Sequence, residues 1–338
     1  MPERKAVDHV TSVREIRRRK TVIQSTAQII RGMKLIATVR LTKDRARAEA
    51  FRPYFEELRG MGAMVLEERE WPEERKGPAG IVAFTSNRGL AGGYSQQIVR
   101  MIAGDGRFLP GTAVVYAVGK RGRDSLAAMG YEIRGDYSEA GERPDGVFAE
   151  KLAGRLLEDY EAGEIGEIYL AYTVFRNAVV QEPRLIRVLP AETEDGRKAE
   201  NGLEAEDGLE AENGLETEDG LESENSLGQE SGPAAMREET VGAGRAGTGE
   251  MEYEPDREQL RERMLPWYMG GMIYGACLEA AASENGARMR AMDSAAGNGK
   301  KLLEELELQY NRARQDTITR ELTEIAAGAG EIMQHEEG

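Results

Sequence analysis

The stretch LEAAASENGARMRAMDSAAGNGKKLLEELELQYNRA, residues 278–313, decides the fold of this 338-residue chain. Mostly small or apolar residues recur in it at alternating steps of four and three. A sustained period of about 3.5 residues is typical of a helix that supercoils with a second helix. The stripe consists of Leu278, Ala282, Asn285, Met289, Met292, Ala296, Gly299, Leu303, Leu306, Tyr310 and Ala313, and its register then shifts to Ile318, Leu322, Ile325 and Ala329.

A second stripe with the same spacing lies near the N-terminus. No proline interrupts it before Pro53, so one helix of about 40 residues and about 60 Å is allowed. We expect the two end helices to pair with each other; the alternative, in which each stripe packs on a globular domain, fits poorly with their lengths. The N-terminal stripe consists of Val13, Ile16, Lys20, Ile23, Ala27, Ile30, Lys34, Ala37, Leu41, Asp44, Ala48 and Phe51.

Between the two stripes, residues 80–190 alternate β-rich and helix-capable runs, which indicates an α/β layer structure. The last two β-rich runs are joined around Arg176 and Asn177 and read as a hairpin, so we expect an antiparallel edge on the sheet. In order, the runs are IVAFTS, Gln96–Ile102, TAVVYAVG, Asp124–Met129, YEI, Phe148–Tyr160, EIYLAYTVF and VVQEPRLIRVLP.

Charge is distributed unevenly along the chain. Residues 191–254 hold 20 acidic and 4 basic residues, which accounts for the whole formal net charge of -16. Within this segment, residues 201–230 form five hexapeptides, NGLEAE, DGLEAE, NGLETE, DGLESE and NSLGQE. The acidic residues repel one another, and the single leucine of each repeat buries too little apolar area to offset the entropy of ordering. We therefore predict a disordered insertion. The alternative is a β-helix with a period of six. It would have only five short turns, which argues against it.

The N-terminal stripe runs through a basic segment. Residues 14–52 hold 12 lysines or arginines and 3 acidic residues, which points to an acidic partner. Nucleic acid is the other candidate partner. The segment lacks interleaved aromatic residues and its charges alternate with the apolar stripe, so we predict no nucleic-acid binding.

The run TSNRGLAGGY, residues 85–94, follows a predicted strand at the place where a dinucleotide fold carries its phosphate-binding turn. Its glycines do not form the G-x-G-x-x-G pattern, and no G-K-[ST] follows. After the second strand, Gly119-Lys120-Arg121 stand where an acidic residue would hold the ribose. We therefore predict no bound nucleotide and no other cofactor.

No group of residues suggests catalysis or a metal. The two histidines, His9 and His335, lie near the chain ends, and no cysteine or histidine pair has metal-ligand spacing. The serines of the α/β region lack a plausible base, and the many carboxylates lie on amphipathic or acidic segments, where solvated faces are the ordinary interpretation. We predict neither a catalytic site nor a metal site.

The sequence also bears on the compartment. A single cysteine, Cys277, forms no internal disulfide and suits a reducing compartment. The start MPERKAVDHV has no apolar core typical of a secretory signal. The uncharged run nearest to a membrane span, around residues 267–278, is glycine-rich and shorter than the about 20 residues that a span needs. We expect a membrane link only through partner proteins.

Three runs resemble the gamma subunits of F-type ATP synthases. They are VREIRRRKTVIQSTAQIIRGMKLIATVRLTKDRARAEAFRPY (13–54), TSNRGLAGGY (85–94) and SENGARMRAMDSAAGNGKKLLEELELQYNRARQDTITRELTEIAAGA (283–329), the last being the most specific. With YEPD at 253–256, the resemblance covers nearly everything outside residues 191–250. Two rival interpretations, a Rossmann-type enzyme with helical extensions and a coiled-coil scaffold unrelated to rotation, leave these terminal motifs unexplained.

The resemblance implies an α/β fold with a long antiparallel coiled coil of the N- and C-terminal helices. In that family the coiled coil lies inside a hexamer of alpha and beta subunits, and a Rossmann-like domain without nucleotide stands on the membrane ring of c subunits. The expected domains are 1–75, the N-terminal coiled-coil helix; 76–190, the Rossmann-like domain; 191–254, the acidic insertion; and 255–338, the C-terminal coiled-coil helix.

The function implied by the resemblance is that of a non-catalytic central-stalk rotor, which couples transmembrane proton flow through the c ring to ATP synthesis or hydrolysis on the beta subunits and regulates ATPase activity. The implied partners are the alpha and beta subunits, the epsilon subunit and the c ring, at the cytoplasmic face of the cell membrane. Contacts with the hexamer are implied for Met33, Lys34, Arg288, Gln315, Thr319 and Glu321. The acidic insertion lies where chloroplast and cyanobacterial members carry a regulatory insertion, but without the cysteine pair of the chloroplast forms.

Overall fold

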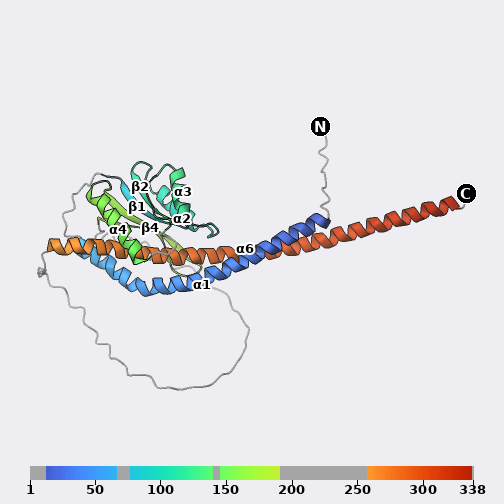
Figure 1. Cartoon of the computed structure of the whole chain (residues 1–338), viewed down its shortest axis with the longest axis horizontal. Coiled ribbons are helices and arrows are strands. Elements are labelled where there is room, and N and C mark those ends of the chain that lie inside the picture. Colours follow the sequence, from blue (N-terminus) through green and yellow to red (C-terminus); the bar gives the residue numbers. More distant parts are fainter. Residues whose placement is uncertain (1–12, 67–76, 140–144, 191–256, 337–338) are drawn as a thin grey trace, which may run out of the picture. The chain divides into compact units, whose positions relative to one another are not determined.

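The computed structural model describes residues 13–66, 77–139, 145–190 and 257–336 (Figure 1). The acidic segment 191–254, for which we predict disorder, lies outside the described residues. In chain order the elements are α1 (Val13–Leu66), β1 (Ala79–Phe84), α2 (Tyr94–Gly104), β2 (Ala113–Val118), α3 (Lys120–Ala128), β3 (Glu132–Asp136), α4 (Gly146–Glu161), β4 (Glu167–Phe175), β5 (Gln181–Leu189) and α6 (Arg257–Glu336).

The middle of the chain forms one five-stranded sheet with the order β3-β2-β1-β4-β5. Strands β1 to β4 run parallel, whereas β5 pairs antiparallel with β4, with Phe175 opposite Gln181 next to the turn. The predicted α/β class, hairpin and antiparallel edge are therefore confirmed.

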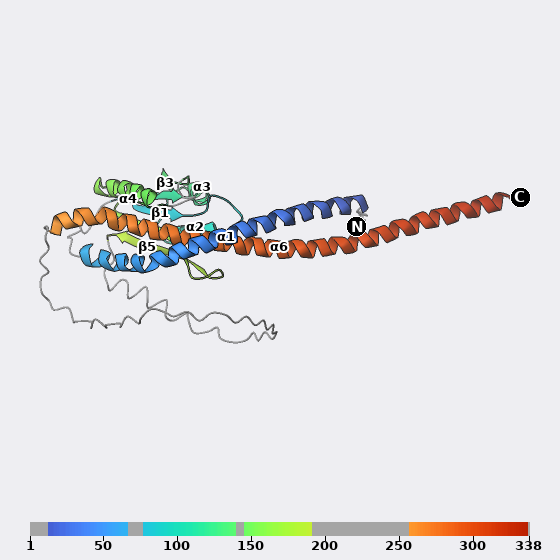
Figure 2. The same ribbon diagram turned by 60° about the horizontal axis from the view of Figure 1, so that its bottom comes forward.

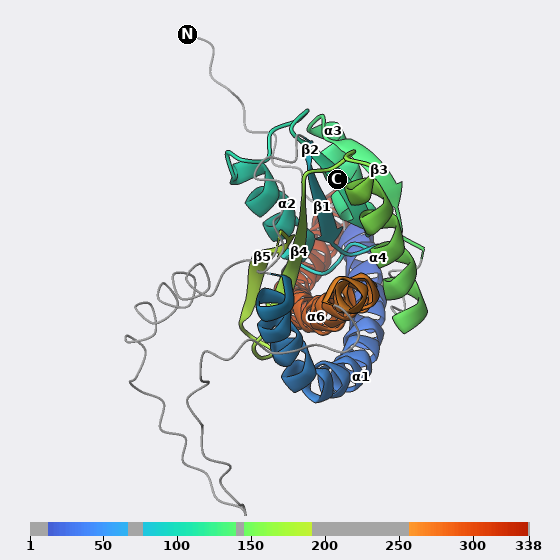
Figure 3. The same cartoon turned by 90° about the vertical axis from the view of Figure 1, so that its left-hand side faces the viewer.

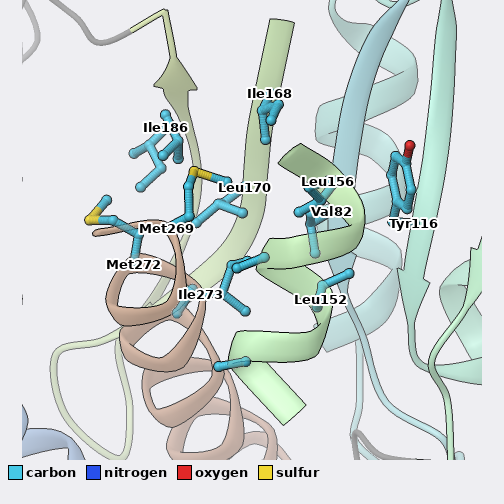
Figure 4. Packing of buried hydrophobic residues seen from close by; sticks show 14 of the residues in the cluster. Val82, Tyr116, Leu152, Leu156, Ile168, Leu170, Ile186, Met269, Met272 and Ile273 are labelled. Atoms are coloured by element: carbon cyan, nitrogen blue, oxygen red, sulfur yellow. The ribbon is translucent and has the colours of Figure 1, made fainter. Parts of the chain in front are cut away.

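The sheet is covered on both faces because its strands alternate apolar side chains between two layers (Figure 3). In β1, Ile81 and Ala83 pack with residues of α2 and α3, whereas Val82 and Phe84 pack with residues of α4 and α6. Figure 4 shows the second layer, in which side chains from the sheet, α4 and α6 interlock. Its labelled members are Val82, Tyr116, Leu152, Leu156, Ile168, Leu170, Ile186, Met269, Met272 and Ile273.

Helix α1 is longer than the sequence predicts, because it continues through Pro53 to Leu66. A proline inside a helix removes one backbone hydrogen bond and costs about 3 kcal/mol. Pro53 lies on the exposed side of α1, where water can solvate the carbonyl group left without a donor. Phe55 and Leu58, two and five residues further on, are only 6% and 1% exposed, and their burial offsets the cost. Packing thus overrides the local stop signal.

The two predicted stripes coincide with the covered faces of the end helices. Every residue of the N-terminal stripe is buried or half-buried, and within residues 13–51 Met33 is the one other residue that is not exposed. The stripe at 278–313 is likewise buried or half-buried throughout. By contrast, Ile318, Leu322 and Ile325 of the shifted register are 43%, 61% and 69% exposed.

Candidate functional site: the helix pair and its junction with the sheet

Three polar contacts align α1 with α6. Lys20 pairs with Glu307, Lys34 pairs with Asp293, and the Asn285 Nδ2 donates to Asp44 Oδ2 at 2.8 Å. Residue numbers rise along one helix as they fall along the other, so the two helices lie antiparallel. Figures 1 and 2 show α1 and α6 side by side along this stretch.

Two glycines of α6 make room for side chains of α1. A Cβ atom at Gly275 would lie 2.2 Å from Phe55 Cδ2, and one at Gly271 would lie 2.4 Å from Leu58 Cδ1. Such distances are far below van der Waals contact, so a side chain at either position would displace Phe55 or Leu58. The glycines of this region therefore leave room for the side chains of α1 next to the sheet.

A buried carboxylate joins both helices to the sheet. Glu279 of α6, whose side chain is 7% exposed, accepts from Arg52 Nη2 of α1 at 2.9 Å. Its second oxygen accepts from the backbone N–H of Phe175, the last residue of β4, at 2.8 Å. Arg52 Nη2 also donates to the Phe175 carbonyl oxygen at 3.0 Å. One charge-assisted network thus connects three elements.

The sequence reasoning missed Glu279, although the sequence carries a signal for it. Glu279 is the only charged residue between Arg263 and Glu284. A lone charge in such an apolar run is buried when the helix packs, and a buried charge needs a partner. The partner could not be identified from the sequence, since Arg52 is 227 positions away.

Further hydrogen bonds fasten α6 to the sheet and its turns. Ser283 Oγ donates to the Thr173 carbonyl oxygen at 3.0 Å, and Arg290 Nη2 donates to Gln181 Oε1 at 2.6 Å. The Tyr94 hydroxyl, at the start of α2, donates to the Ala280 carbonyl oxygen at 3.1 Å. Burial raises the pKa of this phenol well above its usual value, so the hydroxyl stays protonated and remains a donor. Helix α6 is thereby fixed to β4, β5 and α2.

The start of α3, which lies against the glycine-rich turn, does not present free donors for a phosphate. The first three backbone N–H groups of α3, at residues 120–122, donate to Asn87 Oδ1, the Ser86 carbonyl oxygen and Thr85 Oγ1, each at 3.0 Å. Helix N-termini bind phosphate through such N–H groups only when those groups are free. Gly119, at φ 146°, permits this close fit, since a Cβ there would lie 2.1 Å from the Thr85 carbonyl oxygen.

Helix α6 also covers the start of α2, where a dinucleotide fold would hold its pyrophosphate. Ala91 and Tyr94 form a buried cluster with Ala287 of α6. A Cβ at Gly92 would lie 3.9 Å from Ala291 Cβ. The arrangement gives this part of the chain a packing role in place of a nucleotide site.

A hollow of about 440 Å³ lies at the ends of β2 and β3, and the positive charge of Arg123 in its lining is already neutralised. Arg123 pairs with Asp136 at 2.6 Å and with Asp124 at 2.7 Å. Hydrogen bonds from Ser138 and Arg123 hold the pKa of Asp136 below its usual value, so the carboxylate remains charged. This hollow therefore does not favour an anionic ligand. It is lined by Lys120, Arg123, Asp136, Tyr137, Ser138 and Glu139.

The residues implied as hexamer contacts fall into two groups. Lys34, half-buried Met33 and Arg288 lie in the paired part of α1 and α6. Gln315, Thr319 and Glu321 are exposed on α6, beginning about 40 Å along the helix axis from Arg288 at 1.5 Å per residue. The structure does not bring all six residues together into one site.

Arg288 lies in a partly buried acidic setting. Its Nη2 donates to Glu284 Oε1 at 2.6 Å, and its Nη1 donates to Asn285 Oδ1 at 3.4 Å. Burial raises the pKa of Glu284 against the opposing effect of Arg288, and burial also raises the pKa of Asp44 on α1. These carboxyl groups take up protons at a higher pH than exposed ones do.

Two features are absent from the part of the chain that the structure describes. None of its helices is long and apolar enough to cross a membrane. Within the same residues, no cluster of histidine, cysteine and acidic side chains has the geometry to hold a metal ion.

Comparisons with known proteins agree on one family. The family model of ATP synthase matches residues 12–331. The ATP synthase gamma chain of Lachnoclostridium phytofermentans is 39% identical over 333 residues, covering 96% of this chain and 100% of that relative. The sodium ion specific ATP synthase gamma chain of Acetobacterium woodii is 32% identical over 329 residues, covering 94% and 98%. The rotor of the Euglena gracilis mitochondrial ATP synthase shares the fold, with a TM-score of 0.56 at 17% identity over 90% of this chain and 98% of that one.

Proposed function

This chain belongs to the ATP synthase family as a relative of the gamma chains, and from that premise we propose that it is the central-stalk rotor subunit of an F-type ATP synthase. It couples ion flow through the c ring to ATP synthesis or hydrolysis on the beta subunits, and is not itself the catalytic subunit. The observation that carries this function is the full-length match to gamma chains. The structure supports this function in two ways. The helix pair is fastened to an α/β domain, and residues of α6 pack on the glycine-rich turn of that domain.

We propose that the 3.5-residue stripes make α1 and α6 a supercoiled shaft. An asymmetric shaft contacts equivalent subunits of a surrounding hexamer differently, so each rotation step changes which subunit is stabilised in which state. Coupling of this kind is a difference in contact free energy between states. The network around Glu279 would transmit torque between the α/β domain and the shaft.

The proposed partners are the alpha and beta subunits, the epsilon subunit and the c ring, at the cytoplasmic face of the cell membrane. Met33, Arg288, Gln315, Thr319 and Glu321 are proposed as contacts with the hexamer. Lys34 is assigned a different role, because its ammonium group pairs with Asp293 within the chain.

Isolation of this chain from its own cell membranes tests the function. We expect it to co-purify with alpha, beta and epsilon subunits, because a rotor is held by its contacts on both sides. The purified chain by itself should neither hydrolyse ATP nor bind it saturably in calorimetry, since α6 packs on the start of α2 and the first N–H groups of α3 are already bonded. Failure to join the alpha/beta hexamer would support an unrelated scaffold, and micromolar ATP affinity would support a nucleotide-binding enzyme.

We also propose that the acidic segment 191–254 regulates ATP hydrolysis through its charge. With 20 acidic residues it can be attracted to basic surfaces of the rotor or of its partners and slow rotation. Redox control is excluded because the segment contains no cysteine. Salt screens such attraction beyond a Debye length of about 8 Å at physiological ionic strength and about 3 Å at 1 M.

Replacing residues 192–249 by a short Gly-Ser linker tests this regulation. The reassembled complex should hydrolyse ATP faster than the unmodified complex at low salt and at the same rate at high salt. A linker of equal length made of Gly, Ser and Asn controls for loop length. Equal rates at both salt concentrations would show that the segment is a tolerated surface insertion.

A further inference from the structure

The outer half of the helix pair has a thin apolar seam. We define the outer half of the helix pair as residues 13–34 of α1 and 293–313 of α6. This part of α6 begins just after Ala291, the residue that lies next to Gly92 of the glycine-rich turn. Within these two ranges only Ile16 and Leu306 are buried apolar residues. Between the two ion pairs described next, a Cβ at Gly299 would lie 3.9 Å from Ala27 Cβ. Apolar burial alone therefore holds this half less firmly than the half beside the sheet.

Two lysines stand on this seam where a coiled coil ordinarily has apolar residues. Lys20 and Lys34 are 14 residues apart, which is two heptads, and their partners Glu307 and Asp293 are also 14 residues apart. The side chain of Lys20 is 28% exposed and that of Lys34 is 43% exposed, so both are partly covered. Each side chain ends in an ion pair across the seam, one on either side of Ala27 and Gly299.

Sliding the helices by one heptad would replace attraction by repulsion. A slide in one direction brings Lys20 opposite Arg314 and Lys34 opposite Lys300. A slide in the other direction brings Lys20 opposite Lys300 and leaves Lys34 opposite Gly286, without a partner. Polar pairs inside a seam commonly select one register in this way.

We propose that Lys20–Glu307 and Lys34–Asp293 form an internal clamp that keeps the outer half of the helix pair in register under torque. Lys34 accordingly acts on Asp293 of its own chain and not as a grip on the hexamer. This inference rests on the proposed rotor function, because a register matters most where two helices transmit torque together.

The test uses the complete ATP synthase complex with the double reversal K20E/K34E, which sets like charges against Glu307 and Asp293. We expect the number of ions pumped per ATP hydrolysed to fall about two- to fivefold, because two attractive ion pairs become repulsive. The matched control is the quadruple variant with Glu307→Lys and Asp293→Lys added, in which both attractions return with opposite polarity. Its coupling should approach that of the unmodified complex.

An engineered disulfide tests whether the loss of coupling comes from a loss of register. Adding Ala27→Cys and Gly299→Cys places two Cβ atoms about 3.9 Å apart, within the range of disulfides. Oxidation should restore coupling in the K20E/K34E complex, because the bond holds the register that the clamp has lost. The unmodified complex, oxidised in the same way, controls for other thiols. Unchanged coupling in K20E/K34E, or coupling that oxidation fails to restore, would overturn the clamp and indicate that the lysines bind partner subunits.

The rate of disulfide formation gives a readout that does not depend on pumping. In the complex without charge reversal, the thiols at 27 and 299 should join quickly, whereas thiols at 27 and 306, one heptad away, should not. K20E/K34E should slow the first reaction about two- to fivefold. If the unmodified complex does not pump at all, the proposed function fails, while this gel assay still decides the clamp. Equal rates with and without the reversal would contradict it.

Discussion

Replacing Glu279 by leucine is expected to lower the free energy of unfolding by about 2–4 kcal/mol. The change removes the acceptor of the Phe175 N–H group, which is buried, and the partner of Arg52. Arg52 is 36% exposed and can recover part of its hydration, so the estimate lies below that for a fully buried ion pair. Urea unfolding of the purified chain, followed by circular dichroism, measures the effect.

Glu49→Leu is the matched control. Glu49 pairs with Arg45 on the exposed side of α1 at 2.7 Å, and such surface pairs contribute about 0.2–1 kcal/mol. The contrast between the two variants should therefore exceed about 1 kcal/mol. Equal losses in both would mean that the junction of Glu279, Arg52 and Phe175 does not hold the helices to the sheet.

Deleting residues 314–338 is expected to reduce coupling about tenfold, because a coupling free energy of 1–3 kcal/mol corresponds to factors of about 5–150. The proposed contacts Gln315, Thr319 and Glu321 are exposed and lie in the deleted part, as do Ile318 and Leu322. The measurement is ion pumping per ATP hydrolysed by the complex reassembled with the shortened chain.

The same deletion should leave the α/β domain folded. The buried layers of the sheet take their α6 residues from the range 265–280, well before the deleted part. The thermal midpoint of the shortened chain should thus stay within about 2 °C of the full-length chain. A large fall in this midpoint would show that the last turns of α6 belong to the core and that the domain boundaries are wrong.

Short-range patterns in the sequence located the helical seams and the strands correctly. The seam positions of both end helices recur every three or four residues, and the structure covers each of them from Val13 to Phe51 and from Leu278 to Ala313. The strands could be located because apolar β-formers run continuously where a sheet is covered on both faces. Pro53 misled the prediction, since the cost of a proline is local whereas the burial of Phe55 and Leu58 depends on distant partners.

The sequence by itself determined the fold class, the hairpin edge, the two helical seams and, by resemblance, the family. Only the tertiary structure decided which polar groups meet: Glu279 with Arg52, Lys34 with Asp293, and the turn before α2 with the start of α3. The physical reason is that helix and strand periods are properties of neighbouring residues, whereas a hydrogen bond between residues more than 200 positions apart depends on the register of whole elements. That register is set by the packing of whole elements. The role of Gly271 and Gly275, for example, can be seen only when Leu58 and Phe55 lie against them.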